Sequence, residues 1–179
     1  TLISTETPPS NTDDWSKFMR LGPEFRMQVV RHAIAPHFRC GTAGAAVSVG
    51  LASGTYLIMT PPTEDQLEAA LPHLRTAADL RGDRLPEILV QQNDMLSFYA
   101  GQFFLNPERK KWTLTLIAAL YEAVVVPEMQ VKLMCSLPRP IDFTEQVQPI
   151  IATPATSAWP SGHATEAFAF ATILSALEF

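Results

Sequence analysis

A serine, a glycine and a histidine follow one another directly after a proline in the segment Trp159-Pro-Ser-Gly-His-Ala-Thr165. The run from Ala164 to Leu177 is rich in apolar residues and lacks Gly and Pro, which predicts a helix with Ser161 as its N-cap. A helix start presents unpaired backbone N–H groups and the positive end of the helix dipole. It can therefore bind an oxyanion, with a hydroxyl donor from Ser161, close backbone approach at Gly162 and proton transfer by His163.

Two cations, Lys132 and Arg139, precede this segment and lie seven residues apart. Seven residues are about two helical turns, so both side chains would share one face of a continuous helix. Pro138 instead predicts that the helix breaks just before Arg139. Lys offers a point charge and Arg a planar fork, and both suit phosphate-like oxygens.

The spacing of Lys132 and Arg139-Pro140, followed by Pro160-Ser-Gly-His163, resembles the first two motifs of one superfamily. This superfamily unites the type 2 phosphatidic acid phosphatases with the vanadium-dependent haloperoxidases. The resemblance covers residues 122 to 179 and implies an all-α fold, a helical bundle that encloses one pocket for vanadate or phosphate. It also implies one acid/base residue, His163, and a set of oxyanion-binding residues: Lys132, Arg139, Ser161 and Gly162.

The resemblance leaves three functional hypotheses open. Trp159 before the second motif and Ala-Thr after it are closer to the haloperoxidase branch, which uses vanadate as cofactor and oxidises halide with hydrogen peroxide. Thr156 stands where haloperoxidases commonly carry a bulky aromatic residue or a His, which leaves the halide preference unsupported. The alternative is an acid phosphatase that hydrolyses phosphomonoesters through a phospho-histidine and needs no cofactor. The second alternative is a non-enzymatic helical interaction domain.

The third motif of the superfamily, an Arg followed by a His, has no counterpart among the sixteen residues after His163. In the superfamily this His is the nucleophile of the phosphatases and the axial vanadium ligand of the haloperoxidases. We therefore expect no metal ligand in this chain and an axial His downstream of Phe179. We further expect a domain that is incomplete at its C-terminus and inactive alone, and a second polypeptide or a homo-oligomer that covers the C-terminal helix.

Composition bounds the remaining functions. A chain of 179 residues with 47% hydrophobic residues predicts one domain, and a net charge of −5 disfavours a nucleic-acid partner. No stretch reaches the roughly 18 uninterrupted apolar residues of a membrane span, so we expect no span and a soluble protein, with a periplasmic or secreted location left open. Cys40 and Cys135 favour two free thiols over a disulfide.

Helices must position the candidate site in this interpretation. The sequence predicts an extended arm over 1–14 and a single helical domain over 15–179. Residues 38–60 are ambiguous between helix and strand, and we interpret them as small-residue helix packing or irregular backbone. The predicted helices are 15–35 with a break at Gly22-Pro23, 63–80 with a break at Pro72, 85–104, and 112–134; residues 140–159 form a long connection.

Overall fold

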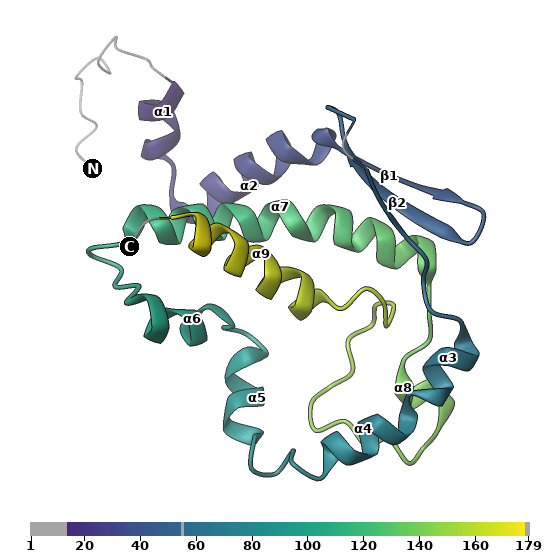
Figure 1. Ribbon diagram of the computed structural model, residues 1–179. Helices are drawn as coiled ribbons and strands as arrows, with labels where there is room; N and C mark the ends of the chain where they lie inside the picture. Colours follow the sequence, from purple (N-terminus) through teal and green to yellow (C-terminus); the bar gives the residue numbers. More distant parts are fainter. Residues whose placement is uncertain (1–13, 55, 178–179) are drawn as a thin grey trace, which may run out of the picture.

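The computed structural model describes residues 14–54 and 56–177 (Figure 1). The extended arm predicted over 1–14 therefore lies outside the described residues, apart from Asp14, which begins a helix. The elements are α1 (Asp14–Arg20), α2 (Pro23–Ile34), the 3₁₀ turn η1 (Ala35–His37), β1 (Phe38–Ala43), β2 (Ala46–Leu51), β3 (Tyr56–Met59), α3 (Glu64–Ala69), α4 (Leu71–Ala78), α5 (Leu85–Gln91), α6 (Leu96–Phe103), α7 (Lys111–Cys135), α8 (Pro140–Phe143) and α9 (Gly162–Ala176).

A three-stranded antiparallel sheet in the order β1-β2-β3 makes the fold mixed α/β, so the prediction of an all-α helical bundle is wrong. Strands β1 and β2 form a hairpin in which Ala43 pairs with Ala46. Gly44 has a φ of +61° and is the first of the two turn residues, which is the position that a type II′ hairpin turn reserves for glycine. The interpretation of residues 38–60 as helix packing or irregular backbone is therefore wrong for the hairpin, where Gly44 forms the turn between β1 and β2.

The helix α7 is the central element. Helices α2 and α9 pack along it, and β1 and β2 contact its C-terminal part (Figure 1). Its 25 residues contain no glycine, and the prediction of a helix over 112–134 is confirmed. The helix ends at Ser136, which adopts the left-handed conformation with a φ of 45° and donates its N–H to the carbonyl of Lys132 at 2.9 Å. Lys132 therefore lies in the last turn of α7.

Predicted caps and breaks at the other helices are confirmed in part. Thr63 caps α3 through a reciprocal capping box with Gln66, and the helix breaks before Pro72 as expected. The single helix predicted over 85–104 is instead two helices, α5 and α6. The backbone N–H of Ser97 donates to the Asp94 carboxylate at 3.0 Å, which starts α6 anew after the turn.

The hydrophobic core lies where α7 and α9 meet. Ile117 and Leu174 are almost fully buried there, at 1% and 0% exposure, and Phe170 and Leu105 complete the cluster. Tyr99 of α6 packs edge-on against Phe170, with ring centroids 6.0 Å apart. This packing holds α9 alongside α7 and brings the start of α9 to the last turns of α7.

The segment Lys111–Phe143 is long and apolar enough, by length and composition, to cross a membrane. This is weak support for a span, because the core helix of a soluble protein meets the same criterion. The expectation of a protein without a membrane span therefore stays a prediction. Cys40 and Cys135 are both free and half-buried.

Candidate functional site

The start of α9 has the local structure that the sequence predicts. The Ser161 hydroxyl oxygen accepts the backbone N–H of Ala164 at 3.3 Å, so Ser161 is the N-cap. The Thr165 hydroxyl donates to the carbonyl of Ser161 at 2.9 Å and tightens the first turn. Within the described part of the chain, the backbone N–H groups of Gly162 and His163 find no acceptor. Two free amides and the positive end of the α9 dipole therefore meet at this point.

Lys132 is buried and binds the segment that leads into α9. Its side chain is 6% exposed, and its ammonium donates to the carbonyl of Ser157 at 3.1 Å and to the carbonyl of Pro160. It also lies 3.9 Å from a carboxylate oxygen of Glu128, one turn earlier on α7. Lys132 thus fixes the position of the α9 start, and its cost of burial is offset by two carbonyls and a carboxylate.

Arg139 binds the same segment from the N-terminus of α8. Its Nε donates to the carbonyl of Thr156 at 2.8 Å, and its Nη2 donates to the Thr156 hydroxyl at 2.8 Å. Its Nη1 makes no hydrogen bond to a described residue. Burial lowers the pKa of Lys132, Glu128 opposes this shift, and the Arg139 guanidinium lowers the pKa further. Both cations lie in one region of the molecule, because both donate to the segment 156–160 that leads into α9.

Sequence reasoning missed Glu128, a buried carboxylate beside the start of α9. Glu128 is 4% exposed, and a Cβ placed on Gly162 would lie 2.8 Å from its Oε1. Its Oε2 is buried with no hydrogen-bond partner among the described residues. Burial raises the pKa of Glu128, and Glu166 on α9 raises it further, whereas Lys132 and His163 oppose the shift. The available signal was its position four residues before Lys132, one helical turn away.

Glu166 is the second carboxyl group that the sequence did not single out. It lies three residues after His163 on α9, and burial raises its pKa while His163 and Lys132 lower it. Glu166 and Glu128 therefore hold protons at higher pH than an exposed glutamate does.

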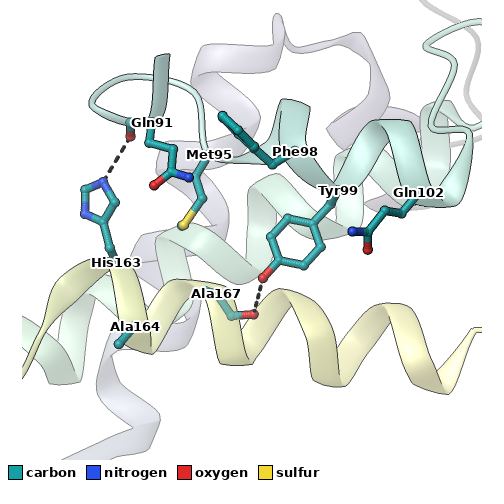
Figure 2. A pocket seen from close by; sticks show the side chains of 8 residues that line it. All are labelled: Gln91, Met95, Phe98, Tyr99, Gln102, His163, Ala164 and Ala167. Carbon is teal, nitrogen blue, oxygen red and sulfur yellow. Dashed lines mark hydrogen bonds between the residues drawn. The ribbon is translucent and has the colours of Figure 1, made fainter. Parts of the chain in front are cut away.

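His163 projects from the first turn of α9 toward the end of α5. Its Nε2 lies 3.0 Å from the carbonyl oxygen of Gln91. Figure 2 marks this contact with a dashed line. A carbonyl can only accept, so Nε2 carries the proton in this contact, and Nδ1 of the neutral ring is left as the base. His163 also lines two cavities, of about 470 Å³ and about 290 Å³.

The donor groups at the α9 start are of the kinds that bind a tetrahedral oxyanion such as vanadate or phosphate. Gly162 and His163 offer backbone N–H groups, Ser161 offers its hydroxyl, and the Arg139 Nη1 remains free among the described contacts. Arg139, however, lines a cavity of about 220 Å³ that shares no lining residue with the two cavities at His163. Lys132 does not line either cavity at His163. It would therefore act on a bound anion through its positive charge and through the loop that it holds. Among the described residues, no group of three or more His, Cys, Asp or Glu side chains is arranged to hold a metal ion.

Comparisons of the chain with protein-family models, with curated proteins and with solved structures give no match. The resemblance to the phosphatase and haloperoxidase superfamily therefore stays a prediction that rests on the two motifs. The assignment of Lys132, Arg139, Ser161, Gly162 and His163 to an oxyanion site stays a prediction as well.

The raised pKa of Glu128 predicts how stability depends on pH. The unfolded chain ionises this group near its ordinary value of 4.5, whereas the folded chain keeps the proton to higher pH. The folded state then binds more protons than the unfolded state, so the contribution of Glu128 to the free energy of unfolding falls as pH rises from about 4.5 through the folded-state pKa. Lys132, Glu166 and His163 modulate this contribution because they act on the same carboxyl group.

The measurement is urea unfolding of the wild type and of Glu128→Gln at several pH values between 4.5 and 8. We expect the free energy of unfolding of the wild type, relative to that of the variant, to decrease with rising pH. Glu87→Gln is the control, because Arg84 lowers the pKa of Glu87 below 4.5. The contribution of Glu87 to stability is therefore lost only at lower pH and should not decrease as pH rises from 4.5 to 8. A difference that stays constant or increases with pH for Glu128→Gln would show that folding does not raise the pKa of this carboxyl group.

Proposed function

We propose that the start of α9 binds a tetrahedral oxyanion and that the protein is a vanadium-dependent haloperoxidase-like enzyme. The observation that carries this proposal is a capped helix start with two unpaired backbone N–H groups, at Gly162 and His163. The segment that leads into this helix is held by hydrogen bonds from Lys132 and Arg139. A helix start of this kind favours negative charge. The two motifs that resemble the superfamily supply the same residues.

Each residue has a distinct role in this proposal. Lys132 and Arg139 hold residues 156–160 in place and provide positive charge that stabilises an oxyanion. Ser161, Gly162 and His163 donate hydrogen bonds from the helix start. A bound vanadate would supply Lewis-acid activation of hydrogen peroxide toward halide. The His163 side chain, anchored through Nε2 to the Gln91 carbonyl, would accept a proton at Nδ1.

One observation favours an acid phosphatase as the second candidate. The larger cavity at His163, of about 470 Å³, has room for an organic group. Halide and peroxide need no such space, whereas the leaving group of a phosphomonoester does. In this mechanism His163 would protonate the oxygen of the leaving alcohol, and the superfamily's downstream His would attack phosphorus.

The proposal is tested by unfolding the protein with orthovanadate or inorganic phosphate present. An oxyanion at 100 times its dissociation constant should add about 2.7 kcal/mol to the free energy of unfolding. Arg139→Ala should weaken anion binding roughly 10- to 100-fold, because a hydrogen bond to a charged group contributes about 1.5–3 kcal/mol. Arg109→Ala is the matched control, since Arg109 is exposed and its side chain makes no hydrogen bond to a described residue.

Anion binding that is equal in Arg139→Ala and Arg109→Ala would contradict the assignment of Arg139. A protein that unfolds cooperatively but gains no stability from either anion would favour the helical interaction domain instead. Peroxide-dependent bromination and aryl phosphate hydrolysis, assayed on the full-length protein with and without vanadate, separate the haloperoxidase from the phosphatase.

A further inference from the structure

A cavity of about 470 Å³ opens between α9 and the segment that contains α5 and α6 (Figure 2). His163 forms one end of its wall, and Met95, Phe98 and Tyr99 form the opposite side. The complete lining is Gln91, Met95, Phe98, Tyr99, Gln102, His163, Ala164 and Ala167. This volume falls in the range of sites that hold small organic ligands.

Two hydrogen bonds frame this cavity and connect its two walls, as Figure 2 shows. At one end His163 Nε2 donates to the Gln91 carbonyl at 3.0 Å. Further along α9, the Tyr99 hydroxyl donates to the carbonyl of Ala167 at 3.0 Å. The Tyr99 ring is also packed edge-on against Phe170 of the core, at an interplanar angle of 85°. The cavity walls are therefore positioned before any ligand binds, which lowers the entropic cost of binding.

The chemistry of the lining selects a neutral aromatic ligand. Phe98 and Tyr99 offer aromatic surfaces, and Met95 offers a thioether, which contacts aromatic rings favourably. Gln91 and Gln102 provide amide groups for a hydroxyl or an ether oxygen. The lining contains no Asp, Glu, Lys or Arg, so no fixed charge compensates an ionised ligand in this space.

We propose that this cavity binds the aromatic ring of a small organic substrate of the phenol class, next to His163. The inference rests on the proposed function, because the ring would lie beside the acid/base residue of the oxyanion site. The same ring chemistry has two sources, a free phenol and the aryl group of a phosphate monoester. In the second case the phosphate would extend toward the α9 start, and the ester oxygen that joins ring and phosphate would lie near His163.

The test uses ¹⁹F NMR titration of the protein with 4-fluorophenol, with 4-fluorobenzoate as the charged comparison. We expect saturable binding of the phenol and weaker binding of the benzoate. Ala164→Leu fills the cavity from an exposed helix position and should weaken phenol binding at least about tenfold. Ala176→Leu makes the same change at an exposed position of α9 outside the cavity and should leave binding unchanged.

A second readout does not depend on the stability of a variant. Methionine methyl resonances of the wild type should report the titration through Met95, which lines the cavity, and not through Met59, which lies in β3. No saturable binding of 4-fluorophenol, or equal binding by Ala164→Leu and Ala176→Leu, would overturn the proposal. A Met95 methyl resonance that does not respond would also overturn it.

The design separates this inference from the oxyanion proposal. Binding of 4-fluorophenol without any binding of vanadate or phosphate would support the aromatic site and contradict the oxyanion site. Binding of vanadate or phosphate without any binding of 4-fluorophenol would contradict the aromatic site and leave the oxyanion site supported. Titration with 4-fluorophenyl phosphate identifies the source of the ring: tighter binding than that of the phenol indicates a phosphate ester, and equal or weaker binding indicates a free phenol.

Discussion

Lys132→Met is expected to lower the free energy of unfolding by about 3–5 kcal/mol, the largest effect of any single substitution considered. The side chain of Lys132 is 6% exposed, and its ammonium donates to the carbonyls of Ser157 and Pro160. Its removal leaves both carbonyls without this donor and leaves Glu128, which is 4% exposed, without its nearest cation. A buried charge that loses its partner is strongly destabilising.

Urea unfolding at pH 7 measures this effect, and Lys111→Met is the matched control on the same helix. Lys111 is exposed, and its ammonium lies 4.9 Å from the centre of the Trp112 ring, a contact worth about 0.5–1 kcal/mol. We expect the control to lose no more than that amount. Equal, small losses in the two variants would mean that the contacts of Lys132 do not hold the segment before α9.

Gly162→Ala is expected to have the second-largest effect, a loss of about 1–3 kcal/mol in the free energy of unfolding. The added Cβ would lie 2.8 Å from Glu128 Oε1 and 3.5 Å from the Glu128 Cδ, so the buried carboxylate must move. Any displacement of Glu128 also disturbs its 3.9 Å contact with Lys132. We therefore expect weaker oxyanion binding in the same variant.

Gly101→Ala is the control, because Gly101 lies in α6 and an added Cβ would meet no atom within 4 Å. Alanine is favoured over glycine in a helix, so this variant should gain up to about 1 kcal/mol. Thermal and urea unfolding compare the two variants directly. A gain in stability for Gly162→Ala as well would show that Glu128 yields without cost and that Gly162 is not required for close approach.

The local structure of the candidate site could be predicted because it depends on short-range rules. An N-cap serine followed by an apolar run without Gly or Pro predicts a helix start, and Ser161 confirms it. The long helix α7 and the break before Arg139 follow from equally local signals. The site's wider connections could not be predicted in this way, because they join residues that are far apart in sequence.

The contacts that the sequence did not reveal are mostly long-range. His163 meets the carbonyl of Gln91 across 72 residues, and Tyr99 meets the carbonyl of Ala167 across 68. Lys132 and Arg139 were predicted to face an oxyanion, whereas each donates to backbone carbonyls of the segment before α9. Backbone carbonyls are present at every residue, so no sequence pattern distinguishes them as partners.

The sheet was missed because its signal is weak in each strand. Strands β1 and β2 are six residues long and rich in small residues, which suit helix packing and hairpins alike. Val47 of β2 is 3% exposed, and this burial is set by residues distant in sequence that a reading of the strand alone does not reveal. The expectation that a partner covers the C-terminal helix stays a prediction. The exposed aromatic side chain of Phe168 on α9, 76% exposed, is compatible with it.

The most direct test of the central claim is a ¹H–¹⁵N NMR titration of the protein with orthovanadate and with inorganic phosphate. If the start of α9 binds an oxyanion, the backbone amide resonances of Gly162 and His163 should shift downfield together and saturate at one dissociation constant, because their free N–H groups gain an acceptor. Resonances of both amides that stay in place at millimolar concentrations of both anions would contradict the account.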